Sequence, residues 1–151
     1  MKRSEVVAAQ AQTRRQLEST GLTVADSLEI EIADFGLGRF AQEGLGIVVR
    51  VNEPEYCSKW LTLWPGQECP VHYHKLKKET FFVLRGEVGL IADGELVTLK
   101  TGDRYTLRPG VRHSFGSPDG AVIEEVSTHD ENSDSYFDDP KVVRDPVVEE
   151  G

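Results

Sequence analysis

Three of the four histidines in the chain combine with one glutamate in a pattern that can hold a divalent metal ion. His72 and His74 are separated by one residue, Glu79 follows five positions later, and His113 stands three residues after Gly110. Residues two apart in a β-strand point to the same side, so an extended segment would direct His72 and His74 to one point. The spacing predicts a metal centre with four ligands, namely His72, His74, Glu79 and His113.

The donor atoms of this set indicate which metals it would accept. Imidazole nitrogens with one carboxylate oxygen suit Mn, Fe, Co, Ni or Zn, whereas Ca and Mg recruit mostly oxygen ligands. Taken alone, Glu79 lies among lysines 75, 77 and 78 and would be interpreted as a solvated ion pair. The combined pattern favours a transition-metal site instead. His129 lies in an acidic stretch and is predicted to be a surface residue outside the set.

The size and charge of the chain limit its organisation and its partners. Its 151 residues fit one domain, 1–151, with one core. A net charge of -9 argues against a nucleic-acid partner, because binding to phosphates requires clustered Lys and Arg. Residues 129–151 carry eight acidic and two basic side chains. We therefore expect residues 128–151 to form an acidic, solvated C-terminal tail.

The chain also carries few signs of export or membrane insertion. Its first residues are positively charged but are not followed by an apolar run, so no secretory signal is expected. No run approaches the length of a membrane span. Cys57 and Cys69 are expected to be reduced thiols, with Cys69 packed in the core. A cytoplasmic protein with no membrane partner follows from these patterns.

The order of the elements predicts one helix followed by many strands. Ser4 is a candidate N-cap for a helix over residues 5–19 that ends near Gly21, which gives an N-terminal helical arm over 1–22. Asp93-Gly94 predicts a hairpin turn. Short apolar runs separated by Gly, Pro, Asp or Asn are typical of an antiparallel all-β barrel. These runs are residues 28–32, 47–51, 60–64, 80–84, 88–92, 96–99, 105–107 and 122–127.

The histidine motif resembles a known superfamily. Residues 66–86 follow the spacing G-x5-H-x-H-x4-E-x6-G, which matches the first motif of the cupins at every defining position, and residues 102–113 resemble the second motif. In the second motif Pro109 adjoins Gly110, where many cupins leave one residue between the two. The resemblance implies an all-β fold, the cupin double-stranded β-helix or jelly-roll barrel, with a short N-terminal helix.

Within the cupins, the chain is most similar to the D-lyxose isomerase family of sugar isomerases. The likeness rests on residues 1–5, 56–60, 66–75, 77–79, 125–127, 132–134 and 139–141. It implies a metal-dependent aldose–ketose isomerase that acts on a small sugar such as D-lyxose or D-mannose by enediol proton transfer, with Mn expected first among the metals, in a homodimer. The chain departs from its relatives at residues 80–82 and at Tyr136, which stands where longer members have an arginine.

The resemblance also assigns candidate catalytic residues. It points to Glu125 as the base, although the adjacent Glu124 has the opposite strand parity and periodicity alone does not choose between them. Lys59 is a candidate to protonate or polarise the sugar oxygen that changes between carbonyl and hydroxyl. A direct hydride shift between the two carbons stays open as the other route. Trp60 and Trp64 fit either a sugar-stacking wall or core packing.

Two other functions use the same residues. Three histidines and a carboxylate also serve Fe-dependent cupin dioxygenases, in which open positions bind dioxygen and a chelating substrate. A non-catalytic sugar-binding cupin is the other alternative. An oxygenase would consume O2 and prefer iron, whereas an isomerase would turn over anaerobically with Mn.

Overall fold

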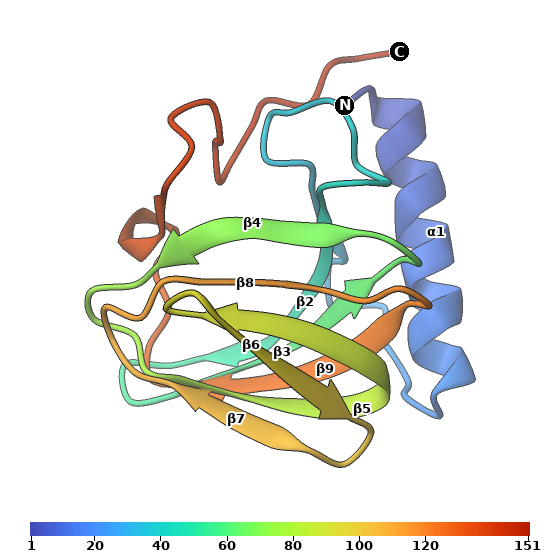
Figure 1. Ribbon diagram of the computed structural model, residues 1–151. Helices are drawn as coiled ribbons and strands as arrows, with labels where there is room; N and C mark the ends of the chain where they lie inside the picture. The colour runs from blue at the N-terminus through green and yellow to red at the C-terminus, as the bar shows by residue number, and fades with distance from the viewer.

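Helix α1 runs along the side of a β-barrel in the computed structural model, which describes residues 1–151 (Figure 1). The helix spans Arg3–Ser19, and Lys2 is its N-cap, with a backbone N–H that donates to Glu5 Oε1 at 3.1 Å. Ser4 therefore lies in the first turn, and its prediction as the N-cap is wrong by two positions. The buried positions recur at intervals of three and four, as in an amphipathic helix. They are Val6, Ala9, Thr13 and Leu17. The helix is neither long nor apolar enough to cross a membrane.

The strands that follow pair antiparallel throughout, which confirms the predicted all-β class. Residues 80–84 and 88–92, predicted as separate runs, form one long strand. Two strands that the apolar runs did not predict, β4 and β8, carry the histidines. The strands are β1 Glu31–Ala33, β2 Leu45–Asn52, β3 Cys57–Leu63, β4 Glu68–Tyr73, β5 Glu79–Ala92, β6 Glu95–Lys100, β7 Arg104–Leu107, β8 His113–Gly116, β9 Ala121–Ser127 and β10 Tyr136–Phe137.

Strand β5 closes the barrel because it belongs to both of its walls. Its first half pairs with β7 and β9, and its second half pairs with β6 and β8. The strand bends at Gly86, which has a φ of 90°. A Cβ at this position would collide with the carbonyl oxygen of Gly120, so only glycine allows this close approach. The strand order is β1-β2-β3-β9-β5-β8-β4-β10.

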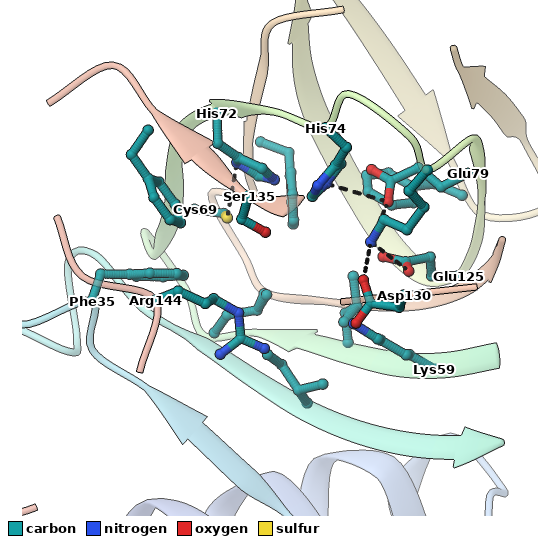
Figure 2. A pocket seen from close by; sticks show the side chains of 17 residues that line it. Phe35, Lys59, Cys69, His72, His74, Glu79, Glu125, Asp130, Ser135 and Arg144 are labelled. Atoms are coloured by element: carbon teal, nitrogen blue, oxygen red, sulfur yellow. Dashed lines mark hydrogen bonds and ion pairs between the residues drawn. The ribbon is translucent and has the colours of Figure 1, made fainter. Parts of the chain in front are cut away.

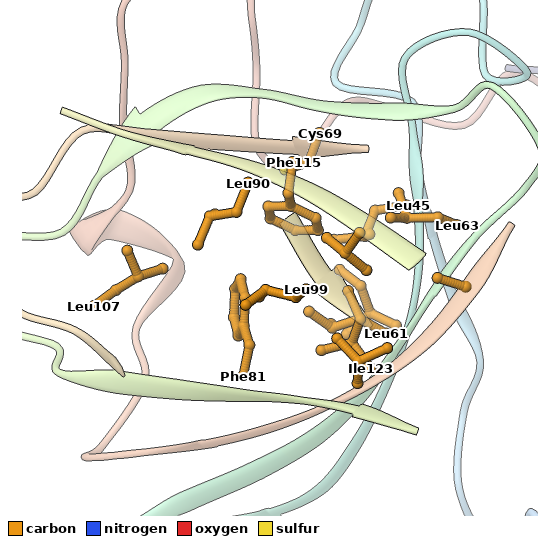
Figure 3. Packing of buried hydrophobic residues seen from close by; sticks show 14 of the residues in the cluster. Leu45, Leu61, Leu63, Cys69, Phe81, Leu90, Leu99, Leu107, Phe115 and Ile123 are labelled. Atoms are coloured by element: carbon orange, nitrogen blue, oxygen red, sulfur yellow. The ribbon is translucent and has the colours of Figure 1, made fainter. Parts of the chain in front are cut away.

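The barrel interior is filled at one end by apolar side chains from both walls (Figure 3). Phe81 and Phe115 meet edge to face, with ring centroids 5.1 Å apart. A smaller cluster between α1 and the barrel contains Trp60, while the ring of Trp64 packs on Phe40. Neither indole lines the pocket that holds the histidines, so a sugar-stacking role there is wrong for both. Trp60 packs in the core, whereas Trp64 is half-buried. Cys57 and Cys69 are buried and unpaired, as expected.

The acidic C-terminal segment, residues 128–151, packs against the barrel instead of extending into solvent. Strand β10 pairs with β4, and Phe137 packs on Phe35 with ring centroids 5.7 Å apart. Asp134 is buried in a short 3-10 turn, Asn132–Asp134. The side chain of Arg144 is only 14% exposed. Most of the charged side chains in this segment are exposed, in keeping with the acidic composition, but the chain itself is docked, and three of its charged residues are bound by the barrel. These three are Asp130, Asp134 and Arg144.

Candidate active site

The three predicted histidine ligands meet inside the open end of the barrel. Their ligand atoms all lie within 4.8 Å of one another, and all three side chains are buried. Strand pairing brings two of them together, because His72 in β4 is the Cα partner of His113 in β8. His74 follows the last residue of β4 and points to the same side as His72 (Figure 2). The segment is extended here, so the period of two places both rings as predicted.

The outer nitrogen of each ring is held by a backbone carbonyl. Nδ1 lies 2.8 Å from the oxygen of Pro70 in His72, 3.0 Å from that of Asp134 in His74, and 3.0 Å from that of Val111 in His113. A carbonyl can only accept, so Nδ1 donates in each case and the neutral ring keeps a lone pair on Nε2. This is the tautomer that metal-binding histidines adopt when a neighbouring group orients them.

Burial keeps two of these rings uncharged. It lowers the pKa of His72 well below its ordinary value, and it lowers the pKa of His74 to about 4. Desolvation disfavours the imidazolium, and the neighbouring rings add to the effect at His72. Both imidazoles are therefore neutral at physiological pH and able to donate to a cation.

Glu79, the first residue of β5, completes the set. Its Oε1 lies 3.1 Å from Nε2 of His113, and its Oε2 lies 3.7 Å from Nε2 of His74. Burial alone would raise the pKa of Glu79, but the charge of Lys77 and the contacts of His113 outweigh it and hold the pKa well below its usual range. The group is an ionised carboxylate with 2% of its surface exposed.

Buried polar atoms in this set lack hydrogen bonds, which tests whether a cation fits. Both carboxylate oxygens of Glu79 and Nε2 of His113 are buried and make no hydrogen bond of acceptable geometry. Lys77 Nζ makes an ionic contact with Glu79 Oε2 at 2.9 Å, but Glu79 Oε1 and His113 Nε2 have no partner outside the set. Buried polar groups without partners are costly in a protein interior unless a ligand satisfies them. Three imidazole nitrogens and one carboxylate also form a donor set that divalent transition metals accept. The residues present therefore fit a divalent metal.

A chain of buried charges extends from Glu79 along the pocket wall (Figure 2). Lys77 Nζ lies 2.9 Å from Glu79 Oε2, 3.3 Å from Glu125 Oε2 and 2.8 Å from Asp130 Oδ1. Lys59 Nζ reaches the other oxygen of Asp130 at 2.8 Å. Burial by itself lowers the pKa of Lys77, but the three carboxylates outweigh it and raise that pKa well above its ordinary value. The ammonium is therefore charged inside the pocket.

Strand β9 directs Glu125 inward and Glu124 outward. Glu125 is buried and is the Cα partner of Lys59 on one side and of Phe81 on the other. Glu124 lies on the outer surface, where it accepts a hydrogen bond from Arg50 at 3.1 Å. Burial, reinforced by the negative charge of Glu79, raises the pKa of the Glu125 carboxyl. The structure thus decides the parity that periodicity left open.

Three charged residues of the pocket were not among the sequence-based candidates, namely Lys77, Asp130 and Arg144. Lys77 lies in a turn without periodicity, and the other two lie in the segment interpreted as solvated. The guanidinium of Arg144 faces the histidines across the pocket and is held by Glu31 through bonds of 2.9 and 3.3 Å (Figure 2). Tyr136 lies outside, stacked on Tyr73 with centroids 5.2 Å apart.

The antiparallel barrel and the histidine cluster at its open end define the class of the protein. Residues 59–126 match the family model described as a cupin domain. Similar folds are found in the L-ribose isomerase of Cellulomonas parahominis, with a TM-score of 0.85 and 17% identity over 100% of this chain and 98% of that one. The L-ribose isomerase of Acinetobacter sp. DL28, in complex with L-ribose, gives a TM-score of 0.86 and 15% identity over the same shares. The protein is a cupin.

Sequence comparison narrows this class. The D-lyxose ketol-isomerase of Cohnella laeviribosi is 36% identical over an alignment of 156 positions, gaps included, that covers 85% of this chain and 86% of the relative. The D-lyxose/D-mannose isomerase of Thermosediminibacter oceani is 32% identical over an alignment of 180 positions, gaps included, that covers 99% of each chain. The chain belongs to the D-lyxose isomerase family of cupin sugar isomerases, and the predicted membership is confirmed.

Proposed function

We propose that this protein is a metal-dependent aldose–ketose isomerase that acts on a small free sugar such as D-lyxose or D-mannose. One observation carries the proposal: neutral imidazoles and an ionised Glu79 converge beside a second buried carboxylate, Glu125, whose pKa is raised. Isomerisation requires one group that stabilises the developing negative charge and another group that moves a proton. The named activities of the two sequence relatives support this assignment.

We propose that His72, His74, Glu79 and His113 hold one divalent transition metal, with Mn as the first candidate and Fe, Co, Ni or Zn as alternatives. Glu79 Oε1 and His113 Nε2, which are buried without a hydrogen bond, support this ligand set. When bound, such a cation supplies Lewis-acid stabilisation for negative charge that develops on adjacent oxygens. The carbonyl-held Nδ1 atoms keep each lone pair directed at one position.

Glu125 is the proposed base. In aldose-to-ketose isomerisation it removes the proton from C2 and returns it to C1, while a second proton passes from the C2 hydroxyl to the carbonyl oxygen at C1. A carboxylate with a raised pKa is a stronger base than an exposed one, and it is more readily reprotonated near neutrality. Its contact with Lys77 Nζ at 3.3 Å supports a position beside the proposed metal ligands, because Lys77 also contacts Glu79.

The two lysines are proposed to act on the sugar oxygens. Lys77 contacts both Glu79 and Glu125, so its ammonium lies where an oxygen next to the reacting carbons can accept a hydrogen bond. Lys59, the lysine predicted from sequence, donates to Asp130 at 2.8 Å. It is connected to the proposed metal ligands only through Asp130 and Lys77. We propose that Lys59 polarises a sugar oxygen together with Lys77, with Asp130 holding both ammonium groups in place.

Measurement of ketose formation tests the proposed function. Protein depleted of metal and then loaded with Mn²⁺ is incubated anaerobically with D-lyxose, D-mannose and related aldoses, and the products are separated by chromatography. Formation of the matching ketose supports the isomerase. Turnover that requires O2 and Fe would indicate a dioxygenase, and sugar binding without any turnover would indicate a binding module. Either of these results would overturn the proposal.

We also propose that the protein forms a homodimer. Apolar side chains remain exposed on the outer face of its sheet, including Val126 on β9 at 44% exposure. Burial of such side chains against a second copy would remove apolar surface from water. Light scattering coupled to size-exclusion chromatography should give a mass of twice the 16.8 kDa chain. A monomer mass across micromolar concentrations would contradict this assembly.

A further inference from the structure

Asp134 lies behind the metal set rather than in the pocket. It belongs to the short turn Asn132–Asp134, its side chain is buried, and it lines no part of the cavity that holds the histidines. We infer that Asp134 is a positioning residue that holds the ligand His74 and the pocket lysine Lys77 in one fixed arrangement. This inference rests on the proposed metal centre.

The carboxylate of Asp134 binds three consecutive backbone N–H groups. Oδ1 accepts from Lys75 at 3.0 Å and from Leu76 at 3.3 Å, and Oδ2 accepts from Leu76 at 3.2 Å and from Lys77 at 3.1 Å. Converging N–H groups in a turn form a concave site for an anion. Asp134 therefore acts as an internal anion that fixes the path of the turn over residues 75–77.

The backbone of the same residue holds the metal ligand. The carbonyl oxygen of Asp134 lies 3.0 Å from Nδ1 of His74, so it orients the imidazole and keeps Nε2 free. Asp134 thus contacts His74 through its main chain and the turn that ends at Lys77 through its side chain. A displacement of Asp134 would move both groups together.

No strand pairing fixes this part of the chain. Strand β4 ends at Tyr73 and β5 begins at Glu79, so residues 74–78 lie between two ladders. At the ends of this stretch, the carbonyl of His74 accepts from Gly110 at 2.7 Å, and the N–H of Lys78 donates to Thr128 at 3.1 Å. The three N–H groups in the middle are bound by Asp134. A side chain from a distant segment therefore sets the geometry between two ligand-bearing strands.

A carboxylate suits this position better than an amide. Three donors need two acceptor oxygens, whereas an asparagine offers one oxygen and turns its NH2 group toward a backbone N–H. Asp134→Asn keeps the size of the side chain but disrupts at least one hydrogen bond. Partners that orient metal ligands typically change metal affinity about 10-fold to 100-fold when they are mutated.

The test compares Asp134→Asn with Asp138→Asn. The control removes the same charge from the same segment, but the Asp138 side chain is 45% exposed and pairs with Arg112 on the surface. Metal-free protein is titrated with Co²⁺, and the dissociation constant and the visible Co²⁺ spectrum are recorded for each protein. We expect Asp134→Asn to bind Co²⁺ about 10-fold to 100-fold more weakly with an altered spectrum. Asp138→Asn should match the wild type in both.

The outcomes separate this inference from the proposed function. Wild-type affinity and an unchanged spectrum in Asp134→Asn would overturn the positioning role and leave the metal centre standing. A wild-type protein that binds no Co²⁺ would overturn both. Circular dichroism of the metal-free variants verifies that they are folded. If Asp134→Asn does not fold, Asp134→Ser, which keeps one acceptor oxygen, takes its place with the same expected and contrary results.

Discussion

Glu125→Gln is the substitution that tests the proposed chemistry most directly. The amide keeps the shape of the side chain but cannot accept the proton from the sugar. A positioned general base typically contributes about 10² to 10⁴ in rate. At about 1.4 kcal/mol for each factor of ten, its loss raises the barrier by about 3 to 5 kcal/mol. We therefore expect kcat to fall by about two to four orders of magnitude.

The structure predicts that this loss is confined to the chemical step. Glu125 forms an ion pair with Lys77 but no hydrogen bond or ion pair with the four proposed metal ligands, so Mn²⁺ affinity and sugar affinity should change little. The assay compares initial rates of ketose formation with sugar binding measured by calorimetry. Glu124→Gln is a matched control, because the neighbouring carboxylate points outward and pairs with Arg50. A wild-type kcat in Glu125→Gln, or an equal loss in Glu124→Gln, would refute the reasoning.

Three further predictions concern the metal, the pH and the core. Treatment with EDTA should abolish turnover, and added Mn²⁺ should restore it; activity that survives complete metal removal by elemental analysis would contradict the ligand set. Burial lowers the pKa of His74 to about 4 from 6.5, so the folded metal-free protein binds fewer protons than the unfolded chain between these values. The free energy of unfolding of the metal-free protein should therefore fall by up to about 3 kcal/mol as the pH drops from 6.5 to about 4. Urea unfolding at a series of pH values measures this change, and a free energy that does not vary with pH would show that the ring is not buried. Phe81→Ala removes a ring that is 1% exposed, and it should lower the free energy of unfolding by about 3 to 5 kcal/mol in the same assay.

Local patterns were sufficient to predict that His72, His74, Glu79 and His113 come together. His72 and His74 share one side of a strand because of its period of two, and this relation is a property of the chain alone. The helix and most strands were likewise visible as periodic or apolar runs. Strands β4 and β8 were not, because they are short and carry the polar ligands where apolar residues would otherwise alternate. The proposed metal ligands therefore occupy positions at which apolar residues would have indicated a strand.

The positions of the other charged residues in the pocket are set by contacts between segments that are distant in the sequence. The choice between Glu124 and Glu125 follows from the register of β9 against β3 and β5, which no local pattern contains. The sequence around Lys77 indicates a surface lysine, whereas in the structure three carboxylates from other segments contact its ammonium group. Arg144 lies in a stretch whose acidic composition indicated a solvated tail, yet Glu31, more than one hundred residues earlier, holds it in the pocket. The composition of a segment predicts whether most of its side chains are exposed, but it does not identify the individual charged residues that are buried.

Strand β5 limits where the chain can tolerate a change in length. Its first residue is the proposed carboxylate ligand Glu79, and both walls of the barrel pair with this strand. One residue added between Glu79 and Gly86 would turn alternate side chains to the opposite side and carry the carboxylate away from the imidazoles. The hairpin tip at Asp93-Gly94 is also constrained, because Asp93 donates to the carbonyl of Arg112 at 2.7 Å, next to His113. The turn at Asp26-Ser27 is exposed and lies outside both alignments. A spectroscopic label or a peptide tag inserted internally therefore belongs in the turn at Asp26-Ser27 rather than at the hairpin tip, because that turn takes no part in the alignment of the barrel walls.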